Sequence, residues 1–334
     1  MHRWLLYLLS FALAAAVALW LTPKMRDAAL RFGIVDRPDG RLKTQREPVP
    51  YLGGVAIYLA FLLSISTTYA LSADVLGILL AGSIVVLLGL LDDLGQLGPT
   101  TKLAGQCVAI LVLVKSGLTI QLAFLPAPVA LLLSVVWLLA TTNAFNLIDV
   151  MDGLSAGTAA VAAAALLVVA DWNGRTASAA MLASLAGACA GFLRYNLPPA
   201  RIYMGDTGSL FLGMSLGALA MNNAYTEHND LAALAPALIL GVPLFDMLFV
   251  MHIRWRRGLP VMLGSPDHVA LRLRSWRLTT AQTVLLSYVA TAFLGAAAVG
   301  MSLVGLRAAC VILAMIVLSA LALATLLRRI DMRL

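Results

Sequence analysis

Long, almost uninterrupted apolar runs recur along the whole chain, and they limit the fold more than any other feature. Of the 334 residues, 61% are hydrophobic and only 12% are charged, whereas a soluble domain carries about 25% charged residues. The mean hydropathy of +0.94 excludes an ordinary soluble enzyme, an intrinsically disordered chain and a nucleic-acid-binding domain. The composition therefore indicates an integral membrane protein.

Eleven segments are apolar enough to be candidate membrane-spanning helices, which need roughly 17–25 residues. These segments are 4–21, 51–71, 75–91, 103–118, 127–142, 154–170, 177–193, 210–221, 231–250, 281–301 and 304–327. Because backbone in hydrocarbon must satisfy its own hydrogen bonds, the sequence predicts an all-α, polytopic integral membrane protein with about 11 transmembrane helices. The first segment is interpreted as a retained helix rather than a signal peptide, because it exceeds a usual signal core and leads into a basic stretch.

The basic residues divide unevenly between alternate loops. With the N-terminus outside, one side of the membrane receives 19 of the 23 lysines and arginines. Positive charge marks the cytoplasmic side, so the N-terminus is predicted outside and the C-terminus in the cytoplasm. The longest loops, 22–50 and 252–280, are too short to hold cores of their own, and residues 1–334 are expected to form a single membrane-embedded domain.

Several carboxylates gather on the side that the basic residues define as cytoplasmic. Asp92 and Asp93 end the third segment, Asp149 and Asp152 follow the fifth, and Asp206 precedes the eighth. Two adjacent carboxylates at a helix C-terminus oppose the helix dipole, which favours a functional role for the first pair. Asp206 is also compatible with a simple helix N-cap, and its pattern alone leaves both interpretations open.

Asn143, Asn146, Asp149 and Asp152 follow one another at intervals of three residues. Each step of three rotates by −60° about a helix, so the four side chains fan over about 180°. They can face one small ligand only if the helix unwinds near Gly153 or if they line a groove between two helices. Amide and carboxylate oxygens without an adjacent basic residue suit a hydrated cation, and Mg²⁺ prefers such ligands.

Several motifs resemble the polyprenyl-phosphate N-acetylhexosamine-1-phosphate transferases, the MraY/WecA/TagO-like membrane enzymes. The motifs are Leu-Leu-Asp92-Asp93, Asn143-Ala-Phe-Asn146-Leu-Ile-Asp149-Val-Met-Asp152-Gly-Leu, Met-Gly-Asp206-Thr-Gly-Ser-Leu-Phe-Leu-Gly, Gly33-Ile-Val-Asp-Arg-Pro and Pro48-Val-Pro-Tyr-Leu-Gly-Gly. The likeness runs in order from about Gly33 to Arg272. Eleven spans are more like the WecA/TagO branch than the ten-span MraY branch.

The resemblance implies a reaction and its partners. A sugar-1-phosphate, GlcNAc-1-phosphate or a related N-acetylhexosamine, would pass from a UDP-sugar to undecaprenyl phosphate with release of UMP. Mg²⁺, with Mn²⁺ as a substitute, would be the cofactor. The reaction would occur at the cytoplasmic face of the bacterial inner membrane and initiate cell-envelope polysaccharide synthesis. Membrane lipid is an expected partner, nucleic acid is not, and a homodimer stays open.

Residue roles follow from the same resemblance. Asn146 and Asp206 match metal-binding positions, and Asp92 and Asp93 match the catalytic acidic pair. The substrate-binding candidates are Asn143, Asp149, Asp152, His268, Arg272 and Arg46. Because the second pKa of a phosphate monoester is about 6, the lipid phosphate is already largely ionised, and we interpret the acidic pair as positioning it rather than removing a proton.

The sequence departs from the family pattern in two places. Val150 stands where a glycine is common, which implies an ordinary negative φ there. The last long loop reads Asp267-His268-Val-Ala-Leu-Arg272 and lacks two of the family's histidines. Donor-phosphate contacts are therefore expected from His268 and Arg272, since an arginine can grip a phosphate with two parallel hydrogen bonds.

Two alternatives remain. A transporter or flippase would use carboxylates as an ion path, but such acids lie near mid-span, and none is recognised near the middle of a predicted span. A catalytically altered homologue is the other alternative, because the histidine loop is depleted.

Overall fold

The computed structural model describes residues 2–36, 48–70, 72–95, 97–260, 265–330 and 332, and it is almost entirely helical. The helices are α1 (His2–Phe32), α2 (Gly53–Thr68), α3 (Ala73–Asp93), α4 (Pro99–Lys115), α5 (Ala127–Ile148), α6 (Leu154–Trp172), α7 (Thr176–Asn196), α8 (Gly205–Met221), the 3₁₀-helix η1 (Asp230–Leu234), α9 (Ala235–Ile239), α10 (Gly241–Arg256), α11 (Val269–Ser275), α12 (Thr280–Leu303) and α13 (Leu306–Arg328). Two short antiparallel strands, β1 (Val35–Asp36) and β2 (Val49–Pro50), pair near the end of α1. The all-α prediction is confirmed.

Each predicted segment overlaps one helix or a run of helices, although α1 continues to Phe32, past the predicted end at residue 21. Among the described residues, seven helices are long and apolar enough to cross a membrane, namely α1, α3, α5, α6, α7, α12 and α13, and the bent stretch from η1 to α10 would make eight. Helices α2, α4 and α8 have 16, 17 and 17 residues. The polytopic membrane fold is therefore confirmed, whereas the number of eleven spans and their orientation stay predictions.

The expected continuous helix over 231–250 is wrong. The chain bends by 80° between Asp230–Ile239 and Gly241–Arg256. Pro243 lies in the first turn of α10, where a missing amide hydrogen costs little, but its ring would clash with the carbonyl four residues earlier in an unbroken helix. The hydrophobic pattern does not register this break.

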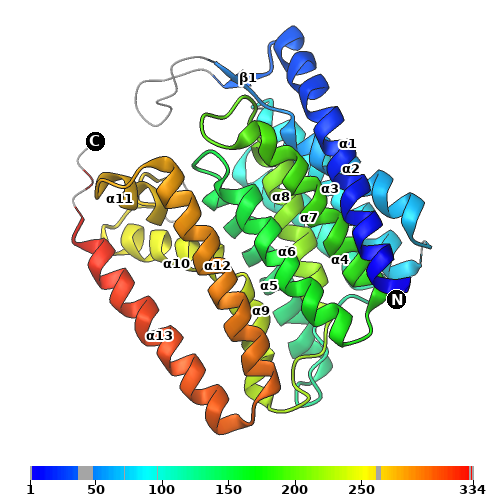
Figure 1. Cartoon of the computed structure of the whole chain (residues 1–334). Helices are drawn as coiled ribbons and strands as arrows, with labels where there is room; N and C mark the ends of the chain where they lie inside the picture. The colour runs from blue at the N-terminus through cyan, green and yellow to red at the C-terminus, as the bar shows by residue number, and fades with distance from the viewer. Residues whose placement is uncertain are drawn as a thin grey trace.

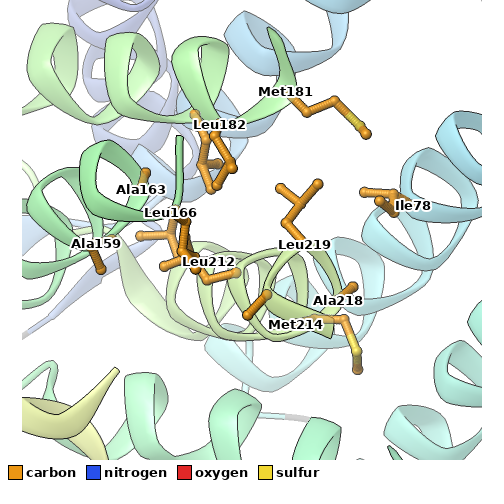
Figure 2. Close-up of a cluster of buried hydrophobic side chains, with 14 of the residues drawn as sticks. Ile78, Ala159, Ala163, Leu166, Met181, Leu182, Leu212, Met214, Ala218 and Leu219 are labelled. Carbon is orange, nitrogen blue, oxygen red and sulfur yellow. The ribbon is translucent and has the colours of Figure 1, made fainter. Parts of the chain in front are cut away.

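Helix α8 forms the centre of the molecule. Every residue from 207 to 221 is buried, and α8 packs against α2, α3, α5 and α6. Figure 2 shows Leu212 of α8 beside Leu166 of α6, and Leu219 of α8 facing the side on which Met181 of α7 and Ile78 of α3 lie. The predicted short, glycine-rich eighth segment is thus the central element of the bundle.

Helix α13 lies at the edge of the molecule. In Figure 1 it runs on the outer side of α12, from the turn between the two helices to its own end near α11. Its main neighbours are α12, η1 and α11. A cavity of about 870 Å³ lies between α10, α12 and α13, and its lining is largely apolar, with Leu244, Phe293 and Met315 among its walls.

Candidate active site

Side-chain oxygens from three helices converge on the ammonium of Lys102 in α4. Its Nζ atom lies 2.7 Å from Asp92 Oδ2 in α3 and 3.0 Å from Asn146 Oδ1 in α5, and it also contacts Asp206 Oδ2 in α8. Asn146 Nδ2 donates to Asp206 Oδ1 at 2.9 Å and to Ser209 Oγ at 3.0 Å. We call Asp92, Lys102, Asn146 and Asp206 the Lys102 cluster.

Asp93, the neighbour of Asp92, binds the first turn of α8. Its carboxylate accepts hydrogen bonds from Asp206 N at 2.7 Å, Thr207 N at 3.1 Å and Thr207 Oγ1 at 2.7 Å. A carboxylate stabilises the positive end of a helix in this way. The N-cap position itself is Met204, without a side-chain cap, so the N-cap interpretation of Asp206 is contradicted, and its carboxylate is available to the Lys102 cluster.

Two glycines permit this close approach of α3 to α8. A Cβ atom on Gly89 would lie 2.5 Å from Thr207 N and Thr207 Cα. Gly205 has φ +70°, and a Cβ atom there would lie 2.5 Å from Asp93 Oδ2. Any larger residue would therefore separate the end of α3 from the start of α8.

The chain leaves helical geometry between Asp149 and Gly153, within the series of asparagines and aspartates. Helix α5 ends at Ile148, α6 begins at Leu154, and Gly153 between them has φ +77°. Outside glycine, only Leu52 and Arg277 have positive φ among the described residues. Of the two arrangements that the spacing leaves open, the structure shows the unwinding near Gly153, and the ordinary φ of Val150 is confirmed.

Asn143 lies one turn before Asn146 and braces α5 against α4. Its Nδ2 atom donates to Gln106 Oε1 at 2.8 Å and to Leu139 O at 2.8 Å, and Gln106 Nε2 donates back to Asn143 Oδ1 at 3.3 Å. In this structure the amide of Asn143 thus binds Gln106 and Leu139 and is not part of the Lys102 cluster.

Asp149 and Asp152 extend the negative charge beyond the helix end. Asp152 Oδ2 accepts a hydrogen bond from Ala200 N at 2.9 Å, whereas within the described part of the chain no donor contacts the Asp149 carboxylate. Burial, followed by the charges of Asp206, Asp93 and Asp152, raises the pKa of Asp149 well above its usual 3.8. Burial, followed by the charges of Asp152, Asp36 and Asp149, raises the pKa of Tyr203 to about 12.

His268 lies in a second, buried cluster with a carboxylate that the sequence analysis overlooked. His268 Nδ1 and Asp246 Oδ2 are 2.6 Å apart, and Val269 N donates to Asp246 Oδ1 at 2.7 Å. Asp246 and His268 are each only 3% exposed. Asp246 therefore fixes the start of α11, and His268 does not reach the surface in this structure.

Arg272 is buried as well, and in this structure it binds protein oxygens rather than facing a site for the donor phosphate. It is 1% exposed; its Nη1 atom donates to Leu327 O at 3.0 Å and to Ile330 O at 2.9 Å, and its Nη2 atom binds Asp267 Oδ1. The guanidinium thus ties the last loop to the end of α13. Because its fork already binds protein oxygens, it has no free pair of donors aimed at a ligand.

The predicted residues fall into separate groups. Asp92, Asp93, Asn146, Asp149 and Asp206 come together at the ends of α3, α5 and α8, while Asp152 faces the loop before α8. His268 pairs with Asp246, and Arg272 pairs with Asp267. This part of the molecule meets the first region through apolar packing of Ile148 and Met151 against Ala270. Arg46 lies outside the described residues.

Sequence reasoning missed two residues of these clusters. Lys102 was counted only as a basic residue of a cytoplasmic loop, although Gln106 four positions later repeats a polar side chain on the same face of an otherwise apolar helix. Asp246 lies inside the predicted span 231–250, and a carboxylate within an apolar segment is itself a signal of function or pairing.

The Lys102 cluster fits a hard divalent cation. Its three converging atoms are carboxylate and amide oxygens, which Mg²⁺ prefers, and all three already point at one positive charge. No group of three His, Cys, Asp or Glu side chains among the described residues is arranged to hold a metal alone.

Comparisons with known proteins agree with the motifs. The model of glycosyl transferase family 4 matches residues 75–224. The chain is 30% identical over 297 residues to a protein of Bacillus subtilis named a probable undecaprenyl-phosphate N-acetylglucosaminyl 1-phosphate transferase, covering 86% of this chain and 83% of the relative. A decaprenyl-phosphate N-acetylglucosaminephosphotransferase of Mycolicibacterium smegmatis is 31% identical (83% and 77% covered), and a phospho-N-acetylmuramoyl-pentapeptide-transferase of Heliobacterium modesticaldum is 33% identical (81% and 90% covered). The predicted resemblance is confirmed, and the chain belongs to glycosyl transferase family 4, the membrane-bound transferases of phospho-sugars.

Proposed function

We propose that this enzyme transfers an N-acetylhexosamine-1-phosphate, GlcNAc-1-phosphate or a close relative, from a UDP-sugar to undecaprenyl phosphate. The products are undecaprenyl-diphosphate-sugar and UMP. The site faces the cytoplasm in a bacterial inner membrane, and the reaction initiates the synthesis of a cell-envelope polysaccharide. The names of the relatives support a polyprenyl-phosphate acceptor.

The observation that carries this proposal is the convergence of oxygens from three helices on one cationic point. Both substrates are phosphate anions that repel each other, so the site must screen their charges before they can react. Asn146 and Asp206, with Asp92 beside them, are the residues that would hold Mg²⁺. When bound, Mg²⁺ would supply Lewis-acid stabilisation of the charge that develops on the phosphoryl oxygens.

The bonding changes need no protein nucleophile. An oxygen of the acceptor phosphate forms a bond to the sugar-bearing phosphorus of the donor, the bond from that phosphorus to the bridging oxygen breaks, and its electron pair leaves on UMP. The acceptor phosphate is largely ionised at neutral pH. Neither acid is therefore needed as a base. Asp92 holds the ammonium of Lys102 in position, and Asp93 holds the first turn of α8 so that Asp206 keeps its position in the Lys102 cluster.

The cavity between α10, α12 and α13 is suited to the isoprenoid chain of the acceptor. Its lining is apolar, and it includes Ile148 and Leu154, which flank the Asp149–Gly153 turn of the site. A chain lying there would have its phosphate end near the acidic cluster, and burial of apolar area would supply the binding energy.

Asp206→Asn tests the proposal. The variant keeps the size of the side chain but offers a weaker ligand to Mg²⁺, so UMP release from a panel of UDP-sugars with undecaprenyl phosphate should fall to background while the melting temperature changes little. Asp230→Asn, in η1 away from the cluster, is the matched control and should keep full activity. Mg²⁺-dependent turnover in Asp206→Asn would remove the metal role, and no UMP release by the wild type from any UDP-sugar would favour a catalytically altered homologue.

A further inference from the structure

Lys102 occupies the point where the proposed metal ligands meet. Its Nζ atom is 2.7 Å from Asp92 Oδ2 and 3.0 Å from Asn146 Oδ1, and it touches Asp206 Oδ2. A magnesium ion binds oxygens at about 2.1 Å. An ammonium and a divalent ion therefore cannot share the space between the same three oxygens, both because they overlap and because their charges repel.

We propose that Lys102 is a built-in counter-ion that competes with the divalent cation for the oxygens of Asp92, Asn146 and Asp206, and that it moves to the phosphates of the donor when the ion enters. This inference rests on the proposed function, because it assumes that these oxygens are the metal ligands. It goes further by making metal binding and nucleotide binding depend on each other through one side chain.

The chemistry of lysine suits such an exchange. Its ammonium is a point charge on a flexible four-carbon stem, whereas the planar fork of an arginine would be held in one geometry. Lys102 and Asp92 keep 17% and 19% of their side-chain surface exposed, and Asp206 keeps 33%. Ions and water can therefore reach the cluster, in contrast to the enclosed Arg272.

The exchange has a thermodynamic consequence. Without a nucleotide, the entering ion must displace the ammonium from anionic partners and leave it without a new one, so the ion binds weakly. A diphosphate offers Lys102 a new anionic partner and gives the ion further oxygen ligands. Metal and nucleotide should thus bind cooperatively, and the coupling must be the same whichever binds first.

Mn²⁺ binding to the purified full-length protein, measured by electron paramagnetic resonance with and without UDP, tests this. Lys102→Met keeps the length of the side chain without its charge, and Lys115→Met, at the exposed end of the same helix, is the matched control. Lys102→Met should bind Mn²⁺ alone about tenfold or more tightly than the wild type, and UDP should strengthen Mn²⁺ binding in the wild type far more than in this variant. Lys115→Met should behave as the wild type.

Equal or weaker Mn²⁺ binding in Lys102→Met would overturn the counter-ion inference while leaving the metal site intact, provided that Asp206→Asn loses Mn²⁺. If Asp206→Asn binds Mn²⁺ as the wild type does, the metal site itself is wrong and the inference falls with it. The two failures are therefore distinguishable.

A measurement on the wild type does not depend on the folding of any variant. Labelling of lysine amines, read by mass spectrometry, should increase at Lys102 when saturating Mn²⁺ is added alone and decrease again when UDP follows. Lys115 serves as the internal reference and should stay constant. Unchanged labelling of Lys102 at saturating Mn²⁺ would overturn the inference.

Discussion

The carboxylate of Asp149 is partly buried near other acids, and its ionisation affects the stability of the fold. Its pKa in the folded protein lies well above the usual 3.8, so the folded state binds this proton more tightly than the unfolded state. Its contribution therefore favours folding at low pH, and that advantage is lost as the pH rises from about 4 through the raised pKa, above which the penalty is constant.

Asp149→Asn should therefore raise the melting temperature at neutral pH by on the order of a few degrees, and it should remove this part of the pH dependence. If Asp149 binds the donor, UMP release should fall in the same variant. Thermal unfolding in detergent between pH 4 and 8 measures the first effect. A lower melting temperature at pH 7 would contradict the view that its charge is uncompensated.

Arg272 joins the last loop to the C-terminal helix, and its loss should be felt as lost stability. Arg272→Ala leaves Asp267 buried without this partner, which costs about 3–5 kcal/mol of unfolding free energy. Arg274→Ala, exposed on the same short helix, should cost little.

Measurement of kcat and KM on the folded fraction of the Arg272→Ala variant completes this test. With a structural role, kcat should fall in proportion to the folded fraction while the KM for the UDP-sugar stays unchanged. A large rise in that KM without loss of stability would restore the phosphate contact predicted from the motif.

The sequence predicted the acidic residues of the site better than their counter-charges. Asp92, Asn146 and Asp206 stand out because polar side chains are rare in this chain and fall at the ends of apolar runs. Lys102 looks like any other basic residue at the cytoplasmic edge, and only the packing of α4 against α3 and α5 brings it among them. For Arg272 the sequence predicts a contact with the donor phosphate, because its acceptors in the structure, Leu327 O and Ile330 O, are more than 50 positions away.

At the scale of elements, the contact between α3 and α8 sets the geometry of the site. Gly89→Ala would place a Cβ atom 2.5 Å from backbone atoms of Thr207, and a clash with backbone cannot be relieved by rotating a side chain. The start of α8 should shift, and because small displacements of reacting groups are costly, activity should fall about tenfold or more.

Gly305→Ala, where a Cβ atom meets nothing within 4 Å, is the control for Gly89→Ala and should keep its activity. The readout is UMP release at saturating substrates, with the melting temperature recorded for both variants. Full activity in Gly89→Ala would mean that α3 and α8 can separate without disturbing Asp206.

Helices were easier to predict than their interruptions. The three-residue spacing from Asn143 to Asp152 left either an unwound segment near Gly153 or a groove between two helices, and Gly153 marked the place of the first. The sequence did not predict the bend at Leu240, because the apolar pattern continues across it. Only Gly241 and Pro243 mark the break. Hydrophobicity reports which residues avoid water, but it does not report the direction in which the next helix runs.

At the scale of the whole molecule, the cavity between α10, α12 and α13 offers a test of acceptor binding. Ala297 lines this cavity, so Ala297→Phe should fill part of it and raise the KM for undecaprenyl phosphate several-fold, with the KM for the UDP-sugar unchanged. Ala296→Phe, on the exposed side of α12, is the control. A variant with an unchanged acceptor KM would place the isoprenoid chain elsewhere.

The peripheral position of α13 has a consequence for the way this enzyme is handled. A cavity of about 870 Å³ with apolar walls does not stay empty beside a micelle, and the alkyl chain of a solubilising detergent fits the same walls as a lipid. Detergent would then act as a competitive inhibitor toward the acceptor. Apparent acceptor affinity should weaken as detergent chains lengthen and recover in nanodiscs, so constants measured in different amphiphiles would describe different competitors rather than different enzymes.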